Sequence, residues 1–453
     1  MFDLIVIGGG PAGYVAAERA GHTGLKTLLI EKRQMGGVCL NEGCIPSKAL
    51  LNSAKIFDYA RHGESYGVFI DGARLDHAKV IARKEKVINM LVSGVKAKMK
   101  KNKVTVLEAE AKILERSTEG FVVVANGEKY IGQRLLIATG SVPVVPPIPG
   151  LEESLVSGFT LTNREILDLK EVPKTLVIVG GGVIGLEMAS YYSSAGSEVI
   201  VVEMLEHIAG QTDKEISSIL KKSLEDKGVK FELGAKVTSI HDGTVAYEKA
   251  GQNYEIKADK ILMSIGRRAF TDGLGLENIG VETNRGAIPT DAHGRTNISG
   301  VYAAGDVNGK SMLAHTAYRE AEVCVNHMLN IKDNMRYSAI PAVIYTYPEV
   351  ASVGETEETA KQKGYDIKTV TLPMIYSGRY VAETEKGDGI TKLVIDKNYN
   401  RILGVHLIGS YASEIIYGAG LMIETELRVE DIKELVFPHP TVGEVIREAL
   451  FEI

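Results

Sequence analysis

The sequence predicts an α/β protein that contains two Rossmann-like dinucleotide-binding domains. The segments "DLIVIGGGPAGYVAAERAGHTGLKTLLIEK" (3–32) and "TLVIVGGGVIGLEMASYYSSAGSEVIVVEM" (175–204) match each other in spacing. In each, a short apolar strand runs into G-x-G-x-x-G, and a helical segment and a second apolar strand follow. An acidic residue stands 18 positions after the last glycine of each motif. The chain therefore carries the same unit of strand, helix and strand twice.

The residues of the two motifs suit the binding of a pyrophosphate. Glycines let the backbone approach the phosphates, and a helix N-terminus offers unpaired N–H groups. An acidic side chain at the end of the second strand can accept hydrogen bonds from a ribose diol and repels a 2'-phosphate. Two such sites suggest a held flavin nucleotide, FAD, and an exchanging nicotinamide nucleotide, and Glu203 favours NAD over NADP. The motif residues are Gly8, Gly10, Gly13 and Glu31 in the first copy, and Gly180, Gly182, Gly185 and Glu203 in the second.

Composition limits the class of protein. At 453 residues, 45% hydrophobic and 24% charged, the chain can form about three or four domains. The formal net charge of -6 offers no basic surface for nucleic acid or for an acidic membrane. No apolar run approaches the roughly 20 residues of a membrane helix, and a strand pattern begins almost at Met1. We therefore expect a cytoplasmic protein without a signal peptide.

Two of the three cysteines, Cys39 and Cys44, lie together in "GGVCLNEGC" (36–44). A disulfide between them would close a very short loop and would stabilise the fold little. Two buried thiols or half of a zinc site are alternatives, although no Cys or Cys/His cluster nearby would complete the zinc ligands, so we expect no metal. A redox dithiol that exchanges with a thiol or disulfide substrate explains the pair better. Lys48 follows in a segment whose apolar spacing predicts a helix after Pro46, and such a helix would favour a thiolate.

Three further apolar segments read as strands that end in glycine. "LLIATGS" (135–141) and "ILMSIGR" (261–267) are expected to close the first and the second nucleotide domain. "GVYAAGD" (300–306) is the third, and it places Asp306 at a strand's carboxyl end, although a helix N-cap is an alternative role for this residue. The proline-rich "SVPVVPPIPG" (141–150) predicts a stiff crossing between the two domains.

Together with "GGVCLNEGCIPSKALL", "AAGDV", "LAHTAYREA" and "FPHPTVGE", these motifs resemble the dihydrolipoamide dehydrogenases, a group within the pyridine nucleotide-disulfide oxidoreductases. The resemblance covers the whole chain. It implies an FAD domain at 1–142, an NAD domain at 143–267, a central domain at 268–336 that completes the FAD site, and a C-terminal α+β dimerisation domain at 337–453. The implied activity is oxidation of protein-bound dihydrolipoyl groups by NAD, as the E3 component of 2-oxo acid dehydrogenase or glycine-cleavage complexes. The implied partners are a second copy of the chain and the lipoyl domains of an acyltransferase or an H-type carrier protein.

The resemblance also implies roles for single residues. Cys44 resembles the cysteine that faces the flavin, and Cys39 resembles the one that exchanges with substrate. Lys48 resembles the lysine beside flavin N5, which pairs with a glutamate that is Glu187 here. His439 would move the proton to and from the substrate thiol, would reach Cys39 of the other subunit, and would be oriented by Glu444. Further implied contacts are Ala111, Thr139, Gly140, Ser141, Asp306 and Ala314 to FAD, and Val237 and Gly266 to NAD.

"HPTVGE" (439–444) also allows a purely structural interpretation. Thr441 and Glu444 could form a capping box at the start of the helix "VGEVIREALF", with His439 as a surface residue. The two interpretations are compatible, because a capping carboxylate has a second oxygen.

The sequence leaves other functions open. A glutathione-reductase-like enzyme is opposed by Glu203, because a 2'-phosphate requires arginine in that region. A mercuric reductase or large thioredoxin reductase is expected to carry a further cysteine pair, and no cysteine follows Cys324. A mainly structural subunit of a large assembly is opposed by the intact cysteine pair and His439. Phe437, Gly443 and "GRRAF" depart from the dihydrolipoamide dehydrogenase pattern and weaken the substrate assignment.

Overall fold

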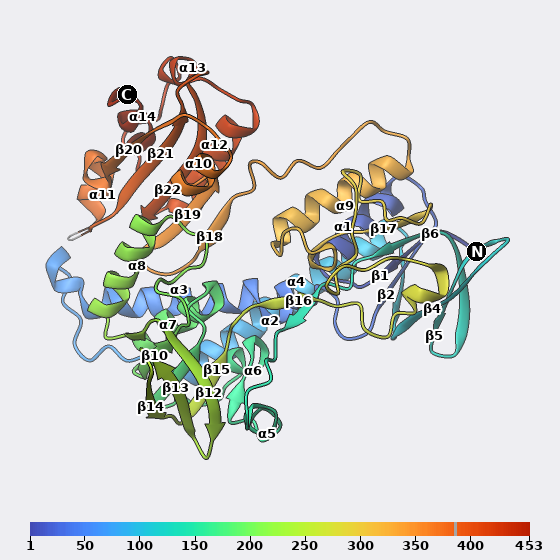
Figure 1. Cartoon of the computed structure of the whole chain (residues 1–453), viewed down its shortest axis with the longest axis horizontal. Helices are drawn as coiled ribbons and strands as arrows, with labels where there is room; N and C mark the ends of the chain where they lie inside the picture. The colour runs from blue at the N-terminus through green and yellow to red at the C-terminus, as the bar shows by residue number, and fades with distance from the viewer. Residues whose placement is uncertain (385–386) are drawn as a thin grey trace. The chain divides into compact units, whose positions relative to one another are not determined.

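The computed structural model describes residues 1–384 and 387–453 (Figure 1). The chain divides into two compact units, and each consists of several stretches of sequence. The first unit contains Met1–Ala49, Lys79–Val144 and Gly266–Arg336. The second contains Leu50–Ala78, Val145–Ile265 and Tyr337–Ile453. The expected first domain, 1–142, is shared between the two units, because Leu50–Ala78 belongs to the second. The boundaries of the four expected domains stay a prediction.

The first unit is built on a sheet of seven strands. The strand order is β3-β2-β1-β6-β5-β4, and β17 pairs in parallel with β6. The strands β1, β2, β3 and β6 are parallel, whereas β4 and β5 form an antiparallel extension. Their bounds are β1 Phe2–Ile7, β2 Thr27–Glu31, β3 Thr105–Glu108, β4 Ala111–Ser117, β5 Gly120–Ala125, β6 Glu128–Ile137 and β17 Val301–Ala303.

Both faces of this sheet are buried. Alternate residues of β1 point to opposite faces, so Leu4 and Val6 join one hydrophobic core and Ile5 and Ile7 join another. Helices α1 and α9 pack against each other in the first of these cores. The remaining elements are α1 Pro11–His22, α2 Gly37–Glu42, the start of α3 Cys44–Arg61, most of α4 His77–Lys101, β7 Ser141–Pro143, β16 Arg267–Ala269, η2 Leu276–Ile279, η3 Asp306–Asn308 and α9 Ala314–Met328.

The second unit contains a parallel sheet of five strands in the order β11-β10-β9-β15-β8. Apolar residues of β9, β10 and β15 pack against a three-stranded antiparallel sheet, β12-β13-β14. The strands are β8 Thr160–Leu161, β9 Thr175–Val179, β10 Glu198–Val202, β11 Lys230–Glu232, β12 Ala235–His241, β13 Thr244–Lys249, β14 Gln252–Lys257 and β15 Lys260–Met263. The helices are α5 Leu151–Val156, α6 Asn163–Leu167, α7 Val183–Ala195 and α8 Lys214–Asp226.

The C-terminal part of the second unit is an antiparallel sheet of five strands, in the order β18-β19-β22-β21-β20. Its helices α12 and α14 contribute apolar side chains to the core on this sheet. The strands are β18 Ala342–Ile344, β19 Glu349–Gly354, β20 Ile367–Pro373, β21 Ile390–Asp396 and β22 Arg401–Gly409. The helical elements of this part are α10 Glu357–Gln362, η4 Met374–Tyr376, α11 Gly378–Glu383, α12 Ala412–Glu424, α13 Val429–Lys433 and α14 Glu444–Phe451. The stretch Leu50–Ala78 of the second unit contains η1 Gly63–Tyr66.

The predicted fold class is confirmed, and the duplicated unit is visible in space. The segment β1-α1-β2 and the segment β9-α7-β10 have the same order, and in each the two strands are parallel neighbours. The strands expected at 135–141, 261–267 and 300–306 are present as β6, β15 and β17. Within the part of the chain that the structure describes, no helix is both long and apolar enough to cross a membrane.

Candidate functional site

Glycines at the two strand-to-helix turns are required by the fold itself. Gly8 and Gly180 have φ of +106° and +105°, a left-handed conformation that other residues rarely adopt. A Cβ on Gly8 would collide with the carbonyl oxygen of Ala138, and one on Gly13 would collide with that of Gly8. Gly185 is restricted in the same way by the carbonyl oxygen of Gly180. These close approaches place the first N–H groups of α1 and α7 at the carboxyl ends of the strands.

The middle glycine of each motif has a different reason to be glycine. The nearest atom to a Cβ on Gly10 would be 3.7 Å away, and on Gly182 it would be 4.0 Å away, so neighbouring protein atoms leave room for a side chain. Both residues are the N-cap of their helix, and as glycines they contribute no side chain that could cap the helix end. The space and the unpaired N–H groups fit the pyrophosphate of a dinucleotide.

The two acidic residues hold the glycine loops in the same manner. Glu31 accepts hydrogen bonds from the backbone N–H of Gly9 and of Arg33, both at 2.7 Å. Glu203 accepts one from the N–H of Gly181 at 2.6 Å and one from the N–H of Leu205 at 2.8 Å. Each carboxylate oxygen retains lone pairs for a ribose hydroxyl. The duplication therefore extends to the hydrogen bonds of the site.

Ala111 and Val237, predicted to contact FAD and NAD, each follow a residue that bonds to the backbone of one of these acidic residues. The N–H of Ala109 donates to the carbonyl of Glu31 at 2.9 Å, and Ala111 follows two residues later. The N–H of Ala235 donates to the carbonyl of Glu203 at 2.9 Å, and Val237 follows two residues later. Ala111 and Val237 thus occupy matching positions in the two copies.

The cysteine segment packs directly on the first glycine loop. The N–H of Gly36 donates to the carbonyl of Gly9 at 2.8 Å. Gly37 lies so close to Gly10 that a Cβ on Gly37 would be 2.5 Å from the Cα of Gly10. Cys39 follows in α2, so one half of the cysteine pair is fixed next to the phosphate cradle.

Cys39 and Cys44 lie on consecutive helices, α2 and α3, and both are half-buried. The structure records them as free cysteines, although the two sulfurs are close enough to form a disulfide. Cys44 is the first residue of α3, so this helix begins earlier than the sequence predicted, before Pro46 instead of after it. At this position Cys44 lies at the positive end of the dipole of α3. Within the described residues, no group of three or more His, Cys, Asp or Glu side chains could hold a metal ion.

Asp306 is part of a polar chain with Ser141 and Arg267. Ser141 donates its hydroxyl hydrogen to Asp306, and Arg267 donates to the Ser141 hydroxyl and carbonyl oxygens, each at 2.8 Å. Burial raises the pKa of Asp306, and the Ser141 hydrogen bond and the Arg267 charge only partly oppose it. Gly305, not Asp306, is the N-cap of η3, so the alternative N-cap role is wrong.

The remaining residues predicted for FAD lie at neighbouring turns of the first unit. Thr139 donates its hydroxyl hydrogen to the carbonyl of Phe270 at 2.6 Å. Gly140 has a φ of +71°, and Ala314 is the first residue of α9. Gly266, predicted for NAD, has a φ of +123°, and its carbonyl accepts from the N–H of Val144 at 3.0 Å.

Glu187 lies on α7, two residues after the last glycine of the second motif. It is 3% exposed, and its carboxylate accepts a hydrogen bond from the backbone N–H of Tyr345 at 3.1 Å. The segment that joins β18 to β19 therefore orients this carboxylate.

His439 and Glu444 meet as the resemblance implies. Nδ1 of His439 is 2.9 Å from one oxygen of Glu444, whose other oxygen accepts from the N–H of Thr441 at 2.8 Å. The capping box is only half formed, because the Thr441 hydroxyl donates to the carbonyl of Pro438 and the helix begins at Glu444 with Gly443 as its N-cap. Thr441 first, and then His439, lower the pKa of Glu444 against the opposing effect of burial.

The predicted residues fall into two sets. Cys39, Cys44, Lys48 and Gly266 belong to the first unit with the FAD residues, whereas Glu187, His439 and the other NAD residues belong to the second. Lys48 donates to the Ser47 hydroxyl at 3.4 Å. Within the first unit, the glycine loop contacts Glu31, and within the second unit the other glycine loop contacts Glu203. His439 contacts Glu444, also within the second unit.

Two residues of the first unit were missed by the sequence analysis. Arg267 joins the Ser141 and Asp306 pair, and it also lines an open cavity of about 400 Å³ with Arg268 and Arg285. Glu320 is buried on α9 and accepts from the N–H of Gly305 at 2.6 Å, which fixes the turn before Asp306. The arginine directly after the strand in "ILMSIGR" was a usable signal for Arg267, whereas Glu320 reads as an ordinary helix residue.

The fold and the cysteine pair together define a disulfide oxidoreductase that uses two dinucleotides. Residues 2–321 match the family model described as pyridine nucleotide-disulphide oxidoreductase, and residues 340–450 match the model for its dimerisation domain. The chain therefore belongs to the pyridine nucleotide-disulphide oxidoreductase family. It is an enzyme, its cofactors are FAD and NAD, and it contains a dimerisation domain.

Relatives in the family match the chain over its full length. Dihydrolipoyl dehydrogenase from Mycoplasma pneumoniae is 41% identical, and the match covers 100% of this chain and 99% of that protein. Dihydrolipoyl dehydrogenase from Chlamydia muridarum is 40% identical, over 99% of this chain and 96% of that protein. The crystal structure of LpdA from Mycobacterium tuberculosis has a TM-score of 0.89 and 25% identity, and covers 99% of each chain.

Proposed function

We propose that the protein oxidises protein-bound dihydrolipoyl groups to lipoyl groups and reduces NAD to NADH. The observation that carries this proposal is the packing of the Cys39 segment on the first glycine loop, through Gly36, Gly37 and the Gly9 carbonyl. A cysteine pair beside a dinucleotide cradle can, in its disulfide form, accept two electrons from a substrate dithiol and, once reduced, pass them to the bound nucleotide. The names of the relatives, dihydrolipoyl dehydrogenases at 40% and 41% identity, support the substrate class.

The cysteine pair would perform the exchange in two thiol steps. One thiolate of the dihydrolipoyl group attacks Cys39 in the Cys39–Cys44 disulfide, the S–S bond breaks, and Cys44 leaves as a thiolate. The second substrate thiol then attacks the mixed disulfide, which releases the lipoyl disulfide and leaves both cysteines reduced. FAD, when bound, supplies the two-electron chemistry that links the reduced cysteines to hydride transfer to NAD. Exchange thus moves two electrons from substrate to the cysteine pair, while the two substrate protons must be accepted by a base.

His439 is the proposed base. A carboxylate can only accept, so the proton between His439 and Glu444 is on Nδ1, and Nε2 presents a lone pair. That nitrogen can take the proton of a substrate thiol and return it in the reverse reaction. Glu444 keeps the ring in this orientation and stabilises the imidazolium that forms.

The cofactor assignments follow the two copies of the motif. The first copy, with Glu31, Asp306, Ser141 and the turns at Thr139, Gly140, Ala111 and Ala314, would hold FAD. The second copy, with Glu203, Val237 and Gly266, would hold NAD. Lys48 and Glu187 would lie next to the reacting ring of the flavin. Binding of NAD rather than NADP is supported by Glu203, which follows β10 and whose two oxygens accept from the N–H groups of Gly181 and Leu205.

The proposed partners are a second copy of the chain and lipoyl domains. The dimerisation domain supports a homodimer. In this dimer His439 would serve Cys39 of the other subunit. The lipoyl group would be carried by an acyltransferase of a 2-oxo acid dehydrogenase complex or by a glycine-cleavage carrier protein. The proposed setting is the cytoplasm.

The test compares nucleotides and disulfides with one purified protein. We expect turnover of NADH with lipoamide, and of dihydrolipoamide with NAD, and little turnover of NADPH or of glutathione disulfide. Faster reduction of glutathione disulfide by NADPH would contradict both the substrate and the nucleotide assignment. Absence of turnover with every pair, in protein that holds FAD, would favour the structural-subunit alternative.

A further inference from the structure

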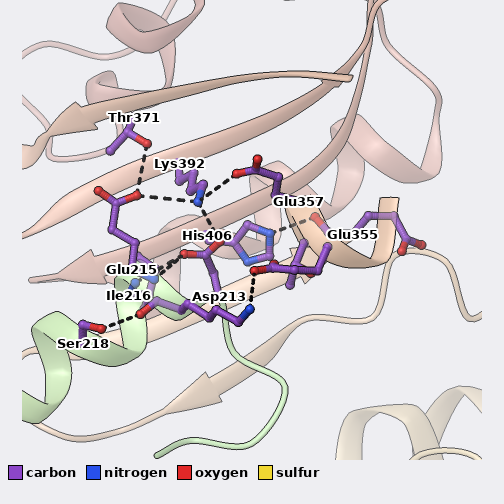
Figure 2. A network of polar contacts seen from close by, with 12 residues as sticks. Asp213, Glu215, Ile216, Ser218, Glu355, Glu357, Thr371, Lys392 and His406 are labelled. Carbon is purple, nitrogen blue, oxygen red and sulfur yellow. Dashed lines mark hydrogen bonds and ion pairs between the residues drawn. The ribbon is translucent and has the colours of Figure 1, made fainter. Parts of the chain in front are cut away.

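A buried ionic network joins helix α8, which follows the second copy of the glycine motif in the chain, to the C-terminal sheet (Figure 2). Its centre is Lys392 on β21, whose side chain is only 10% exposed. The Lys392 ammonium lies 2.9 Å from a carboxylate oxygen of Asp213, 3.6 Å from Glu215 and 3.5 Å from Glu357. One cation from the C-terminal sheet therefore faces three anions, two of them from the start of α8.

Asp213 performs two tasks with its two oxygens. One oxygen caps α8 and accepts from the N–H groups of Glu215 and Ile216, at 3.0 and 3.4 Å. The other oxygen accepts from Lys392, and the Asp213 side chain is 1% exposed. Burial acts to raise the pKa of Asp213, but the hydrogen bond and charge of Lys392, together with His406 and the Ile216 N–H, outweigh this effect, so the pKa lies below its usual value. Both partners are thus charged inside the protein.

The start of α8 is tied in turn to the second glycine loop. Ser217, in the first turns of α8, donates its hydroxyl hydrogen to the carbonyl of Ile208 at 2.8 Å. The next residue, Ala209, donates its N–H to the carbonyl of Gly181 at 2.8 Å. The N–H of Gly181 is held by Glu203 at 2.6 Å. A continuous path of hydrogen bonds and covalent chain therefore runs from Lys392 through Asp213 and α8 to the loop between Gly180 and Gly182.

Stability alone explains this network poorly. A buried ion pair is often no more stabilising than apolar residues of the same size, because both charges lose their hydration. Its particular effect is to fix one geometry, since removing either partner leaves a charge buried. Lys392 can reach Asp213 only when the start of α8 is held at one distance from β21.

We propose that Lys392 is a positioning residue for the nicotinamide dinucleotide, which holds the start of α8 and through it the Gly181 loop in the conformation that binds the pyrophosphate. This inference rests on the proposed assignment of NAD to the second glycine motif. It makes the C-terminal sheet, which carries no residue of that motif, a determinant of nucleotide affinity. The predicted signature is a change in NAD affinity with little change in the rate at saturating nucleotide.

The decisive variant is Lys392→Met, which removes the ammonium and keeps most of the stem. We expect the Kd of NAD, measured by titration of the oxidised, FAD-loaded protein, to rise about tenfold, and the KM for NAD to rise with it. The kcat at saturating NAD and the FAD content should stay close to those of the wild type. Lys392→Arg, which keeps the charge, should recover a substantial part of the affinity.

A second variant and a matched control separate positioning from general damage. Asp213→Asn retains a good helix cap but loses the charge, so it should raise the Kd in the same direction. Lys222→Met is the control, because Lys222 also joins α8 to the C-terminal segment, by a 2.8 Å pair with Asp388 in which both side chains are at least 65% exposed. We expect this exposed pair to leave the Kd unchanged within about twofold.

The outcomes distinguish the inference from the proposed function. A wild-type Kd in both Lys392→Met and Asp213→Asn would overturn the positioning role, and so would an equal rise in the Lys222→Met control. If Lys392→Met does not fold, the same titration on Asp213→Asn decides. A wild-type protein that does not bind NAD would instead overturn the proposed nucleotide assignment.

Discussion

The Nδ1 atom of His439 lies 2.9 Å from a carboxylate oxygen of Glu444, and this hydrogen bond selects one tautomer of the imidazole. The His439 side chain is 78% exposed whereas that of Glu444 is 17% exposed, so the histidine projects from a carboxylate that is anchored in the fold. The Thr441 N–H bond to the second oxygen prevents Glu444 from turning away. An exposed base held in this way is suited to a proton that arrives with a substrate.

Glu444→Gln tests this orientation. An amide can donate as well as accept, so the ring is no longer held with its proton on Nδ1, and the positive charge that develops on the imidazole loses its partner. We expect kcat for dihydrolipoamide to fall about 10- to 100-fold, less than the loss of the base itself in His439→Gln. Steady-state rates of both variants, with FAD content as the control for folding, give the comparison. Equal losses in the two variants would mean that the orientation argument is wrong.

Cys44→Ser tests the relay between the cysteines. The variant should retain FAD and lose almost all dihydrolipoamide turnover, because a serine hydroxyl cannot leave as a thiolate or re-form the disulfide. Cys324→Ala is the matched control, since Cys324 is buried in the core and burial raises its pKa. This control should keep most of the activity. More than a small residual fraction of wild-type turnover in Cys44→Ser would exclude the disulfide relay.

Glu203→Arg tests the choice of nucleotide. An arginine loses the bonds to Gly181 and Leu205, and it replaces a group that repels a 2'-phosphate by one that attracts it. We expect kcat/KM to fall for NAD and to rise for NADP, each by about tenfold. Glu203→Gln removes only the charge, so its kcat/KM values for both nucleotides should lie between those of the wild type and of Glu203→Arg. A wild type that already prefers NADP would refute the assignment.

The sequence predicted the parts of the site that depend on local geometry. The tight turns at Gly8 and Gly180 need backbone conformations that favour glycine, so the G-x-G-x-x-G spacing reveals them in the sequence. The adjacent strands and helices follow from apolar periodicity. Contacts between segments that are distant in the chain could not be predicted from the sequence. The bond from Gly305 to Glu320 and the pair of Asp213 with Lys392, 179 positions away in the chain, depend on packing that no local pattern encodes. The start of α14 was misplaced because Thr441 bonds to Pro438 instead of to the helix.

His406 gives a prediction about pH and stability. This residue on β22 is 1% exposed, its Nε2–H donates to the carbonyl of Glu355 at 2.9 Å, and among the described residues Nδ1 has no hydrogen-bond partner. Burial lowers its pKa, with Lys392 acting in the same direction and the Glu355 carbonyl, Asp213 and Glu358 in the opposite one. The folded protein therefore keeps this histidine neutral at a pH where the unfolded chain already binds a proton.

The sign follows from proton binding. Below about pH 6.5 the unfolded state binds more protons at this position, so the free energy of unfolding falls as the pH falls, until the folded pKa is passed. His406→Gln retains a donor for the Glu355 carbonyl and has no titration in this range. Its Tm should depend less on pH than that of the wild type between about pH 5 and 7. Parallel curves for the two proteins would show that His406 contributes nothing to the acid sensitivity.

Sharing of the active site across the dimer gives the last prediction. The two sets of predicted residues, the cysteine pair and the pair of His439 with Glu444, belong to different units of the chain, and the chain contains a dimerisation domain. A heterodimer of one Cys44→Ser chain and one His439→Gln chain, isolated with two different tags, distinguishes two arrangements. If each site takes His439 from the other subunit, one site has both defects and the other has neither.

About half of the wild-type activity per dimer is therefore expected from a shared arrangement, whereas sites built within a single chain would all be inactive. Residual activity does not blur this difference, because loss of a general acid or base in His439→Gln costs about two to four orders of magnitude. The two homodimers, Cys44→Ser and His439→Gln, are the controls and should both be inactive with FAD bound. Exchange of subunits during the assay would regenerate these inactive homodimers and lower the activity with time, so the initial rate after isolation is the quantity to compare. An inactive heterodimer that retains FAD would show that His439 acts within its own chain.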